Sequence, residues 1–322
     1  MTTNEVFYGK IILFGEYGII FDSMALTIPF SHFHGELSFD NKNNKYKYTD
    51  YDFALNSNNQ LREYAANLSN LSSNVSKGLD LNLEAFQRDL DEGLYFESTI
   101  PQGYGLGSSG ALVAALYNQY ANNKIEGVRT ISKSDTLKLK EVFSTMENFF
   151  HGKSSGIDPL NSYIKFPLLI NSKTDIETVG IPRNKFDSNA AIFLVNTGKI
   201  GKTEPLVNLF LEHCKNSDYL DSIKNEYIPL NNKCILHLIN GEMDDFFKCL
   251  TILSAFQYRS FSDMIPEDFK GYWKDGIDSN YFNLKLCGSG GGGYLLGFTT
   301  DLPKTQQYFN DQHVDIVTVY KS

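Results

Sequence analysis

The spacing of apolar residues near the N-terminus predicts short strands. Mostly apolar runs cover Lys10–Phe14, Ile19–Phe21 and Ala25–Phe30, and glycine or polar residues separate them. Such runs between turn residues are typical of strands joined by tight turns. Leu94–Ile100 has the same character and stops at Pro101, which cannot donate to a sheet ladder. We therefore predict that the chain opens on a sheet.

Helical spacing follows further along the chain. Ala111–Tyr120 is apolar enough to predict a buried helix. Between Leu139 and Phe150, apolar residues recur every three or four positions, which gives a helix one apolar face. The residues Ser132–Asp135 supply the start signals of this second helix, which is predicted to end at His151-Gly152, because glycine commonly follows the last helical turn.

The pattern restarts beyond about residue 170. Ala190–Asn196 predicts a strand, and several helical segments separate it from a strand, glycine loop and strand over 284–298. A last strand is predicted for Val314–Tyr320. Strands interleaved with helices in two halves predict an α+β protein of two lobes, with residues 1–175 and 176–322 as its domains.

Composition and charge exclude several function classes. The 322 residues include 38 acidic and 29 basic ones, for a net charge of −9, and no dense basic run favours a nucleic-acid partner. An acidic protein can still bind ATP through backbone amides, a helix N-terminus and a metal ion. The four cysteines lack CxxC spacing and are interpreted as reduced, mostly buried thiols. Without a secretory signal or a long apolar run, we expect a cytoplasmic protein with no membrane partner.

The most informative segment is a glycine- and serine-rich stretch between a predicted strand and a predicted helix. Glycine lets the backbone pass close to a phosphate, and a helix N-terminus presents N–H groups and partial positive charge to an anion. A serine at the helix start could also ligate Mg²⁺. The segment therefore predicts a site for nucleotide phosphates. Its residues are Pro101, Gly103, Gly105, Leu106, Gly107, Ser108, Ser109 and Gly110.

Two other interpretations of this stretch stay open. A glycine-rich turn with a serine N-cap would need no ligand. The spacing Gly105-x-Gly107-x-x-Gly110 also fits the dinucleotide fingerprint, which would indicate an NAD-dependent dehydrogenase. That fingerprint requires an acidic residue about twenty positions later, where the chain has Arg129-Thr130-Ile131 before another helix.

The sequence Pro-x-Gly-x-Gly-Leu-Gly-Ser-Ser-Gly-Ala at 101–111 resembles the signature loop of the GHMP kinases, a superfamily that includes galactokinase and the homoserine, mevalonate and phosphomevalonate kinases. Gly9–Ile20 resembles the first motif of this superfamily, and Lys285–Tyr294 is similar to its third. The resemblance therefore spans nearly the whole chain. It implies an N-terminal, ATP-binding lobe like ribosomal protein S5 domain 2 and a ferredoxin-like C-terminal lobe.

One segment narrows the resemblance to the mevalonate kinases. Glu147 followed by His151–Asp158 is similar to the stretch in which a helical glutamate precedes HGxPSGxD. The chain departs from the mevalonate kinase pattern with Tyr17 in place of a common His, Asp22 in place of Gly, Ser154 in place of Pro, and Pro159 after the aspartate. Tyr17 is expected on the substrate side, so it bears on the acceptor more than on the chemistry.

The resemblance implies roles for particular side chains. Asp158 would accept the proton of the attacking hydroxyl, and Lys10 would pair with Asp158 and favour the developing charge. Glu147 and Ser109 would hold Mg²⁺. His151 ends a helix, and a cation there complements the helix dipole, which is a sufficient structural role for it. The predicted substrate residues are Glu16, Tyr17, Gly156, Gly288, Ser289 and Gly290.

The expected reaction converts ATP and (R)-mevalonate to ADP and 5-phosphomevalonate, for isoprenoid precursor synthesis. ATP and Mg²⁺ are the expected cofactors, a small metabolite is the expected partner, and a homodimer stays open. The alternatives are another GHMP kinase, such as a phosphomevalonate or sugar kinase, and a catalytically idle nucleotide-binding regulator. Lys10, Glu147 and Asp158 are all present, which argues against the idle regulator.

Overall fold

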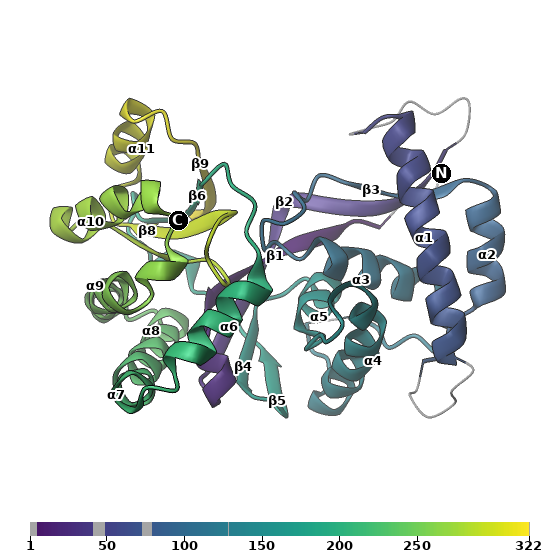
Figure 1. Ribbon diagram of the computed structural model, residues 1–322, viewed down its shortest axis with the longest axis horizontal. Helices are drawn as coiled ribbons and strands as arrows, with labels where there is room; N and C mark the ends of the chain where they lie inside the picture. Colours follow the sequence, from purple (N-terminus) through teal and green to yellow (C-terminus); the bar gives the residue numbers. More distant parts are fainter. Residues whose placement is uncertain (1–4, 41–48, 73–78, 128, 322) are drawn as a thin grey trace. The chain divides into compact units, whose positions relative to one another are not determined.

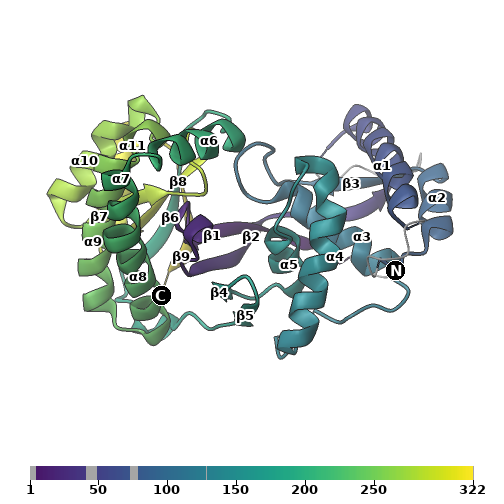
Figure 2. The same ribbon diagram turned by 60° about the horizontal axis from the view of Figure 1, so that its bottom comes forward.

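The computed structural model folds into two compact units, drawn in Figures 1 and 2. The described residues are 5–40, 49–72, 79–127 and 129–321. The first unit comprises residues 1–10, 29–101 and 106–166, and the second comprises residues 11–28, 102–105 and 167–322. Because the units alternate along the chain, no single cut separates them. The division into domains 1–175 and 176–322 stays a prediction.

The first sheet has the strand order β1-β2-β4-β5, and β3 pairs with another part of β2. Its strands are β1 (Phe7–Phe14), β2 (Ala25–Phe39), β3 (Leu94–Ser98), β4 (Leu168–Ser172) and β5 (Asp175–Thr178). β2 pairs antiparallel with β4 through Ala25–Thr27 and with β3 through Gly35–Phe39. Gly35 is required at its position, because a Cβ there would lie 2.2 Å from the Phe96 ring. The predicted strand before Pro101 is confirmed.

The predicted strand at Ile19–Phe21 is wrong. Gly18–Phe21 forms a single 3-10 turn, η1. Tyr17 before the turn has φ 57° and Asp22 after it has φ 60°, both in the left-handed region. Left-handed backbone at both ends reverses the chain direction, so this apolar run cannot extend as a strand.

The first unit contains five helices within the described residues. They are α1 (Tyr51–Ser72), α2 (Leu83–Asp91), α3 (Ser108–Tyr120), α4 (Lys133–His151) and α5 (Ile157–Ile164). The predicted start and end of α4 are confirmed: Ser132 Oγ accepts a hydrogen bond from Asp135 N at 3.1 Å, and Gly152 with φ 68° follows the last turn. α3, α4 and α5 pack against one another, as Figures 1 and 2 both show.

The second unit contains an antiparallel sheet in the order β7-β8-β6-β9. Its strands are β6 (Ala191–Asn196), β7 (Phe282–Leu286), β8 (Tyr294–Thr299) and β9 (Ile316–Lys321). Its α-helices are α6 (Thr203–His213), α7 (Ser217–Ser222), α8 (Ile228–Asn240), α9 (Met243–Ser260), α10 (Lys270–Ser279) and α11 (Leu302–Asp311), and Ile223–Tyr227 is a π-helical turn, η4. The predicted α+β class is confirmed.

Helices α9 and α10 pack on β7 in the second unit. The fully buried Trp273 of α10 donates its indole N–H to Ser254 Oγ of α9 at 3.0 Å. Ser254 Oγ in turn donates to the Leu284 carbonyl of β7 at 2.6 Å. These bonds satisfy buried polar groups and fix the helices on the strand. No helix in the described part of the chain is long and apolar enough to cross a membrane.

Candidate active site

Lys10 and Asp158 form an ion pair in the first unit. Lys10 lies on β1 and Asp158 lies in the first turn of α5, with Lys10 Nζ 3.1 Å from Asp158 Oδ1. The side chain of Lys10 is 6% exposed and that of Asp158 is 32% exposed. A buried ammonium requires such a partner, because removing an unpaired charge from water is costly. The pair therefore fixes a carboxylate that solvent can still reach.

The predicted phosphate loop lies against this ion pair. The Leu106 carbonyl accepts a hydrogen bond from Lys10 N at 2.8 Å, which joins the loop to β1. Gly107 has φ 73°, and a Cβ there would lie 2.9 Å from Lys10 Cγ and 3.6 Å from Asp158 Oδ2. Only glycine fits both the backbone angle and this contact without a shift. A loop predicted from glycine content is thus placed beside the two predicted catalytic residues.

The N-terminus of α3 packs directly on the first turn of α5. A Cβ on Gly110 would lie 2.8 Å from the Asp158 carbonyl carbon and 2.8 Å from Pro159 N. The first N–H groups of a helix have no partner within that helix, and together with the helix dipole they attract anions. The 13-residue helix α3 begins at Ser108 and Ser109. Its start is therefore suited to a phosphate group next to Asp158.

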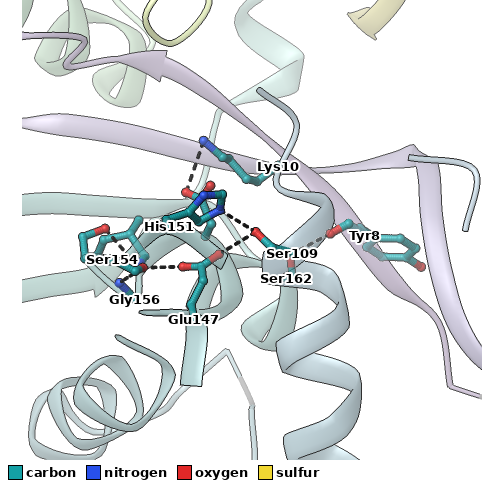
Figure 3. A network of polar contacts seen from close by, with 11 residues as sticks. Tyr8, Lys10, Ser109, Glu147, His151, Ser154, Gly156 and Ser162 are labelled. Carbon is teal, nitrogen blue, oxygen red and sulfur yellow. Dashed lines mark hydrogen bonds and ion pairs between the residues drawn. The ribbon is translucent and has the colours of Figure 1, made fainter. Parts of the chain in front are cut away.

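Ser109, Glu147, His151 and Ser154 form one hydrogen-bonded network, shown in Figure 3. Ser109 Oγ donates to Glu147 Oε1 at 3.0 Å and lies 2.9 Å from His151 Nε2. A hydroxyl has one hydrogen, so His151 Nε2 is the donor in the second contact. Ser154 Oγ donates to the other carboxylate oxygen of Glu147 and accepts from Gly156 N at 3.0 Å. The network joins α3, α4 and the loop that leads to Asp158.

The carboxylate of this network belongs to Glu147, and its surroundings shift its pKa. Its side chain is buried, and burial, followed by the negative charge of Asp158, raises its pKa to about 7. Hydrogen bonds from Ser154 and Ser109 and the charge of Lys10 act in the opposite direction. A raised pKa means that this environment disfavours the ionised carboxylate, and a cation bound beside Glu147 would favour the ionised form again.

The residues present fit Mg²⁺ with few protein ligands. Ser109 and Glu147 offer a hydroxyl and a carboxylate oxygen, which are the hard ligands that Mg²⁺ prefers. Within the described residues, no group of three or more His, Cys, Asp or Glu side chains could hold a metal ion. Mg²⁺ commonly binds through one or two carboxylates together with waters and substrate phosphates. The arrangement suits a metal ion that arrives with a nucleotide.

The other predicted site residues belong to the second unit, apart from Pro101, which follows β3, and Gly156, which precedes α5. The buried Glu16 forms an ion pair with the fully buried Lys285 of β7. Tyr17 O–H donates to the Ser289 carbonyl at 2.6 Å, and its ring centroid lies 4.6 Å from that of Phe210. Tyr17 thus contacts the glycine loop that follows β7, and Glu16 contacts β7 itself. Their contact with a substrate stays a prediction.

Four predicted site glycines of the second unit have left-handed backbone angles. Gly103 and Gly105 have φ 77° and 73°, and Gly288 and Gly290 have φ 78° and 77°. The Gly103 carbonyl accepts a hydrogen bond from Gly201 N at 3.1 Å. Residues with a Cβ atom could not adopt these backbone angles without strain. Their binding roles stay predictions.

Solved structures share this fold over the whole chain. The structure of L. major mevalonate kinase in complex with R-mevalonate has a TM-score of 0.66 at 16% identity, and the match covers 100% of this chain and 97% of that chain. The Methanococcus jannaschii mevalonate kinase has a TM-score of 0.62 at 19% identity, with 100% and 99% covered. The Streptococcus pneumoniae phosphomevalonate kinase in complex with phosphomevalonate and AMPPNP has a TM-score of 0.61 at 15% identity, with 99% and 100% covered.

The sequence itself matches a family model. Residues 74–163 match the model described as the GHMP kinases N terminal domain. Residues 74–163 are therefore similar to the GHMP kinases N terminal domain, and the chain shares the fold of solved GHMP kinases. The matched stretch contains Ser109, Glu147 and Asp158, whereas Lys10 precedes it. No protein of curated function matches the sequence significantly.

Two members of the network around Glu147 were not predicted as site residues. His151 was interpreted as a helix-end cation, but it also donates to Ser109. Residues four apart share a helix face, so the spacing of Glu147 and His151 on α4 was a usable signal. Ser154 was noted only as a departure from the mevalonate kinase pattern. Nothing in the sequence indicates that its hydroxyl bonds to Glu147.

Proposed function

We propose that the chain transfers the γ-phosphoryl group of MgATP to a hydroxyl of a small metabolite, and that the acceptor is (R)-mevalonate. The main support for this proposal is the Lys10–Asp158 ion pair, with Nζ and Oδ1 3.1 Å apart, beside the N-terminus of α3. Phosphoryl transfer requires mainly positioning and neutralisation of charge. The first unit offers a carboxylate, an ammonium and a helix N-terminus within one small region.

Each of these groups has a role in the proposed reaction. Asp158 orients the acceptor hydroxyl and takes its proton as the oxygen attacks phosphorus. Lys10 holds the carboxylate of Asp158 and favours the negative charge that develops on the transferred group. The N–H groups at the start of α3 bind the phosphates. Mg²⁺ held by Ser109 and Glu147 would neutralise phosphate charge.

The choice of mevalonate rests on the segment Glu147 to Asp158 and on the fold neighbours. One neighbour is a mevalonate kinase in complex with R-mevalonate, and another is a phosphomevalonate kinase bound to phosphomevalonate and AMPPNP. Phosphomevalonate carries extra negative charge and would favour additional cations near the acceptor. In the first unit, the cation that directly contacts Asp158 is Lys10. The hydroxyl end of mevalonate carries no charge and requires no cation in addition to Lys10.

The test is ADP release by the purified chain with MgATP and one acceptor at a time. Mevalonate, phosphomevalonate, homoserine and galactose form the panel, and phosphorylated product is identified by mass spectrometry. Turnover that depends on mevalonate is expected. Turnover with another acceptor would overturn mevalonate as substrate and keep the proposed chemistry. ATP binding without turnover on any acceptor would favour the idle regulator instead.

Replacing Glu147 with glutamine is expected to raise the Mg²⁺ concentration for half-maximal turnover at least about tenfold. Glutamine keeps an oxygen that can accept from Ser109 but removes the charge that would bind the cation. The measurement is a Mg²⁺ titration of turnover, paired with calorimetric binding of ATP at each Mg²⁺ concentration. Glu141→Gln, on an exposed position of the same helix, is the matched control. An unchanged Mg²⁺ requirement would remove Glu147 from the metal site.

Ser154→Ala is expected to raise the Mg²⁺ concentration for half-maximal turnover by about tenfold or less. Its kcat at saturating Mg²⁺ should change less than about twofold. The Ser154 hydroxyl orients the second carboxylate oxygen of Glu147 without lying on the reacting atoms. Ser154→Thr keeps a hydroxyl and should restore most of the native Mg²⁺ titration. A fall in kcat of Ser154→Ala that saturating Mg²⁺ does not restore would contradict this positioning role.

A further inference from the structure

Two thiols of the second unit lie in direct contact, away from the candidate active site residues. Cys234 is on α8 and Cys249 is on α9, the helix that follows the turn at Gly241. Cys234 Sγ donates to Cys249 Sγ across 3.2 Å. A disulfide bond measures about 2.05 Å, so the sulfurs need to approach by only roughly 1 Å to bond. Both cysteines are free thiols in this structure.

The two thiols have unequal surroundings. Cys234 is fully buried, whereas Cys249 is 7% exposed. The hydrogen bond from Cys234 lowers the pKa of Cys249 against the opposing effect of burial, and the nearby charges of His237 and Lys233 add to the lowering. Burial raises the pKa of Cys234. Because the thiolate is the nucleophile, Cys249 is the thiol that attacks first and Cys234 is placed to follow.

We propose that Cys234 and Cys249 form an oxidation site for hydrogen peroxide. The Cys249 thiolate attacks one peroxide oxygen, the O–O bond breaks, and the leaving oxygen departs as water after protonation, which leaves a sulfenic acid on Cys249. Cys234 Sγ then attacks the Cys249 sulfur and releases a second water as its own proton is lost. The two thiols give up two electrons, the peroxide is reduced, and one disulfide joins α8 to α9.

The position of the pair gives this disulfide a structural consequence. α9 supports β7 through the Ser254 bond to the Leu284 carbonyl and through Gln257 Oε1, which accepts from Leu286 N at 2.9 Å. β7 leads into the glycine loop at Gly288. Oxidation thus cross-links α9, which packs on this strand, to its neighbour α8. This oxidation site is separate from the proposed phosphoryl transfer, and the proposal does not depend on which metabolite accepts the phosphoryl group.

Peptide mapping tests the proposal on the full native chain. Trypsin cuts after Lys233, Lys248 and Arg259, so the two cysteines fall in separate peptides, 234–248 and 249–259. Hydrogen peroxide is expected to link these two peptides within one chain, and dithiothreitol is expected to release them. Cys214, whose thiol pKa burial raises, serves as the internal reference and should lose alkylation at least about tenfold more slowly.

Two variants separate the steps. In Cys234→Ser, Cys249 should stop at a sulfenic acid that dimedone traps, and in Cys249→Ser, Cys234 should stay reduced. Oxidation of Cys214 before the pair, or disulfides only between chains, would overturn the proposal. So would a pair that stays alkylatable after Cys214 is oxidised. If either variant fails to fold, the peptide map of the native chain decides the question by itself.

Discussion

Replacing Asp158 with asparagine is expected to lower kcat by about 10³- to 10⁴-fold, with ATP affinity within about threefold of the native value. An amide cannot accept the proton of the acceptor hydroxyl, and it cannot form an ion pair with Lys10. The side chains have nearly the same shape, so the contact of Gly110 with the backbone of residue 158 is kept. The loss should therefore appear in the chemical step rather than in nucleotide binding.

The measurement is single-turnover phosphoryl transfer together with calorimetric binding of ATP. Lys10→Met and the double variant Lys10→Met/Asp158→Asn complete a double-mutant cycle. Because both residues act on the same reacting group, the double variant should lose little more than Asp158→Asn alone. Purely additive losses would indicate that the pair does not act as a unit. An Asp158→Asn protein that keeps more than about a tenth of native kcat would exclude Asp158 as the base.

Gly156→Ala is expected to destabilise the first unit by roughly 3–5 kcal/mol, the sum of a backbone cost and a steric cost. Gly156 has φ 75°, and its added Cβ would lie 2.2 Å from the Lys140 carbonyl oxygen and 2.7 Å from Ser144 N. Both contacts are to the backbone of α4, which cannot rotate away as a side chain could. Gly156 was predicted to contact substrate. The structure adds a packing reason for its small size.

Gly152→Ala is the matched control for this substitution. Gly152 also has a positive φ of 68°, with ψ −41°, but its added Cβ meets nothing within 4 Å, so only a backbone cost of about 1–3 kcal/mol applies. Urea unfolding followed by circular dichroism compares the two variants through their midpoints. Equal midpoints would show that α4 yields to the added methyl group. Gly156→Ala should also reduce turnover, because Gly156 is the N-cap of the helix that carries Asp158.

The local pattern of the sequence determined much of the first unit. Helical periodicity and a serine N-cap gave α4 with its end at Gly152, and the residues before Ser108 gave a glycine loop that opens α3. Glu147 and Asp158 are close in sequence, so their neighbourhood could be predicted. These features depend on short-range backbone preferences, which the residues carry wherever they are placed in a fold.

Local pattern failed where backbone geometry or long-range contact decided. The apolar run Ile19–Phe21 has strand composition, but left-handed residues at both ends make it a 3-10 turn. Strands β4 and β5 were not predicted, since their short runs gain stability only by pairing with β2 and with each other. Glu16 looked like a substrate residue by resemblance. The structure shows that it is buried with Lys285.

The sequence by itself determined the residue types of the candidate site, its glycine loop and the helix that carries Glu147. The resemblance implied that Lys10 pairs with Asp158, and the structure has the two side chains 3.1 Å apart. The tertiary structure alone decided that Ser154 and His151 complete the network around Glu147, and that Cys234 touches Cys249. The reason is physical. Local conformation follows from each residue and its near neighbours, whereas contacts between distant segments exist only once packed strands and helices have fixed their distances.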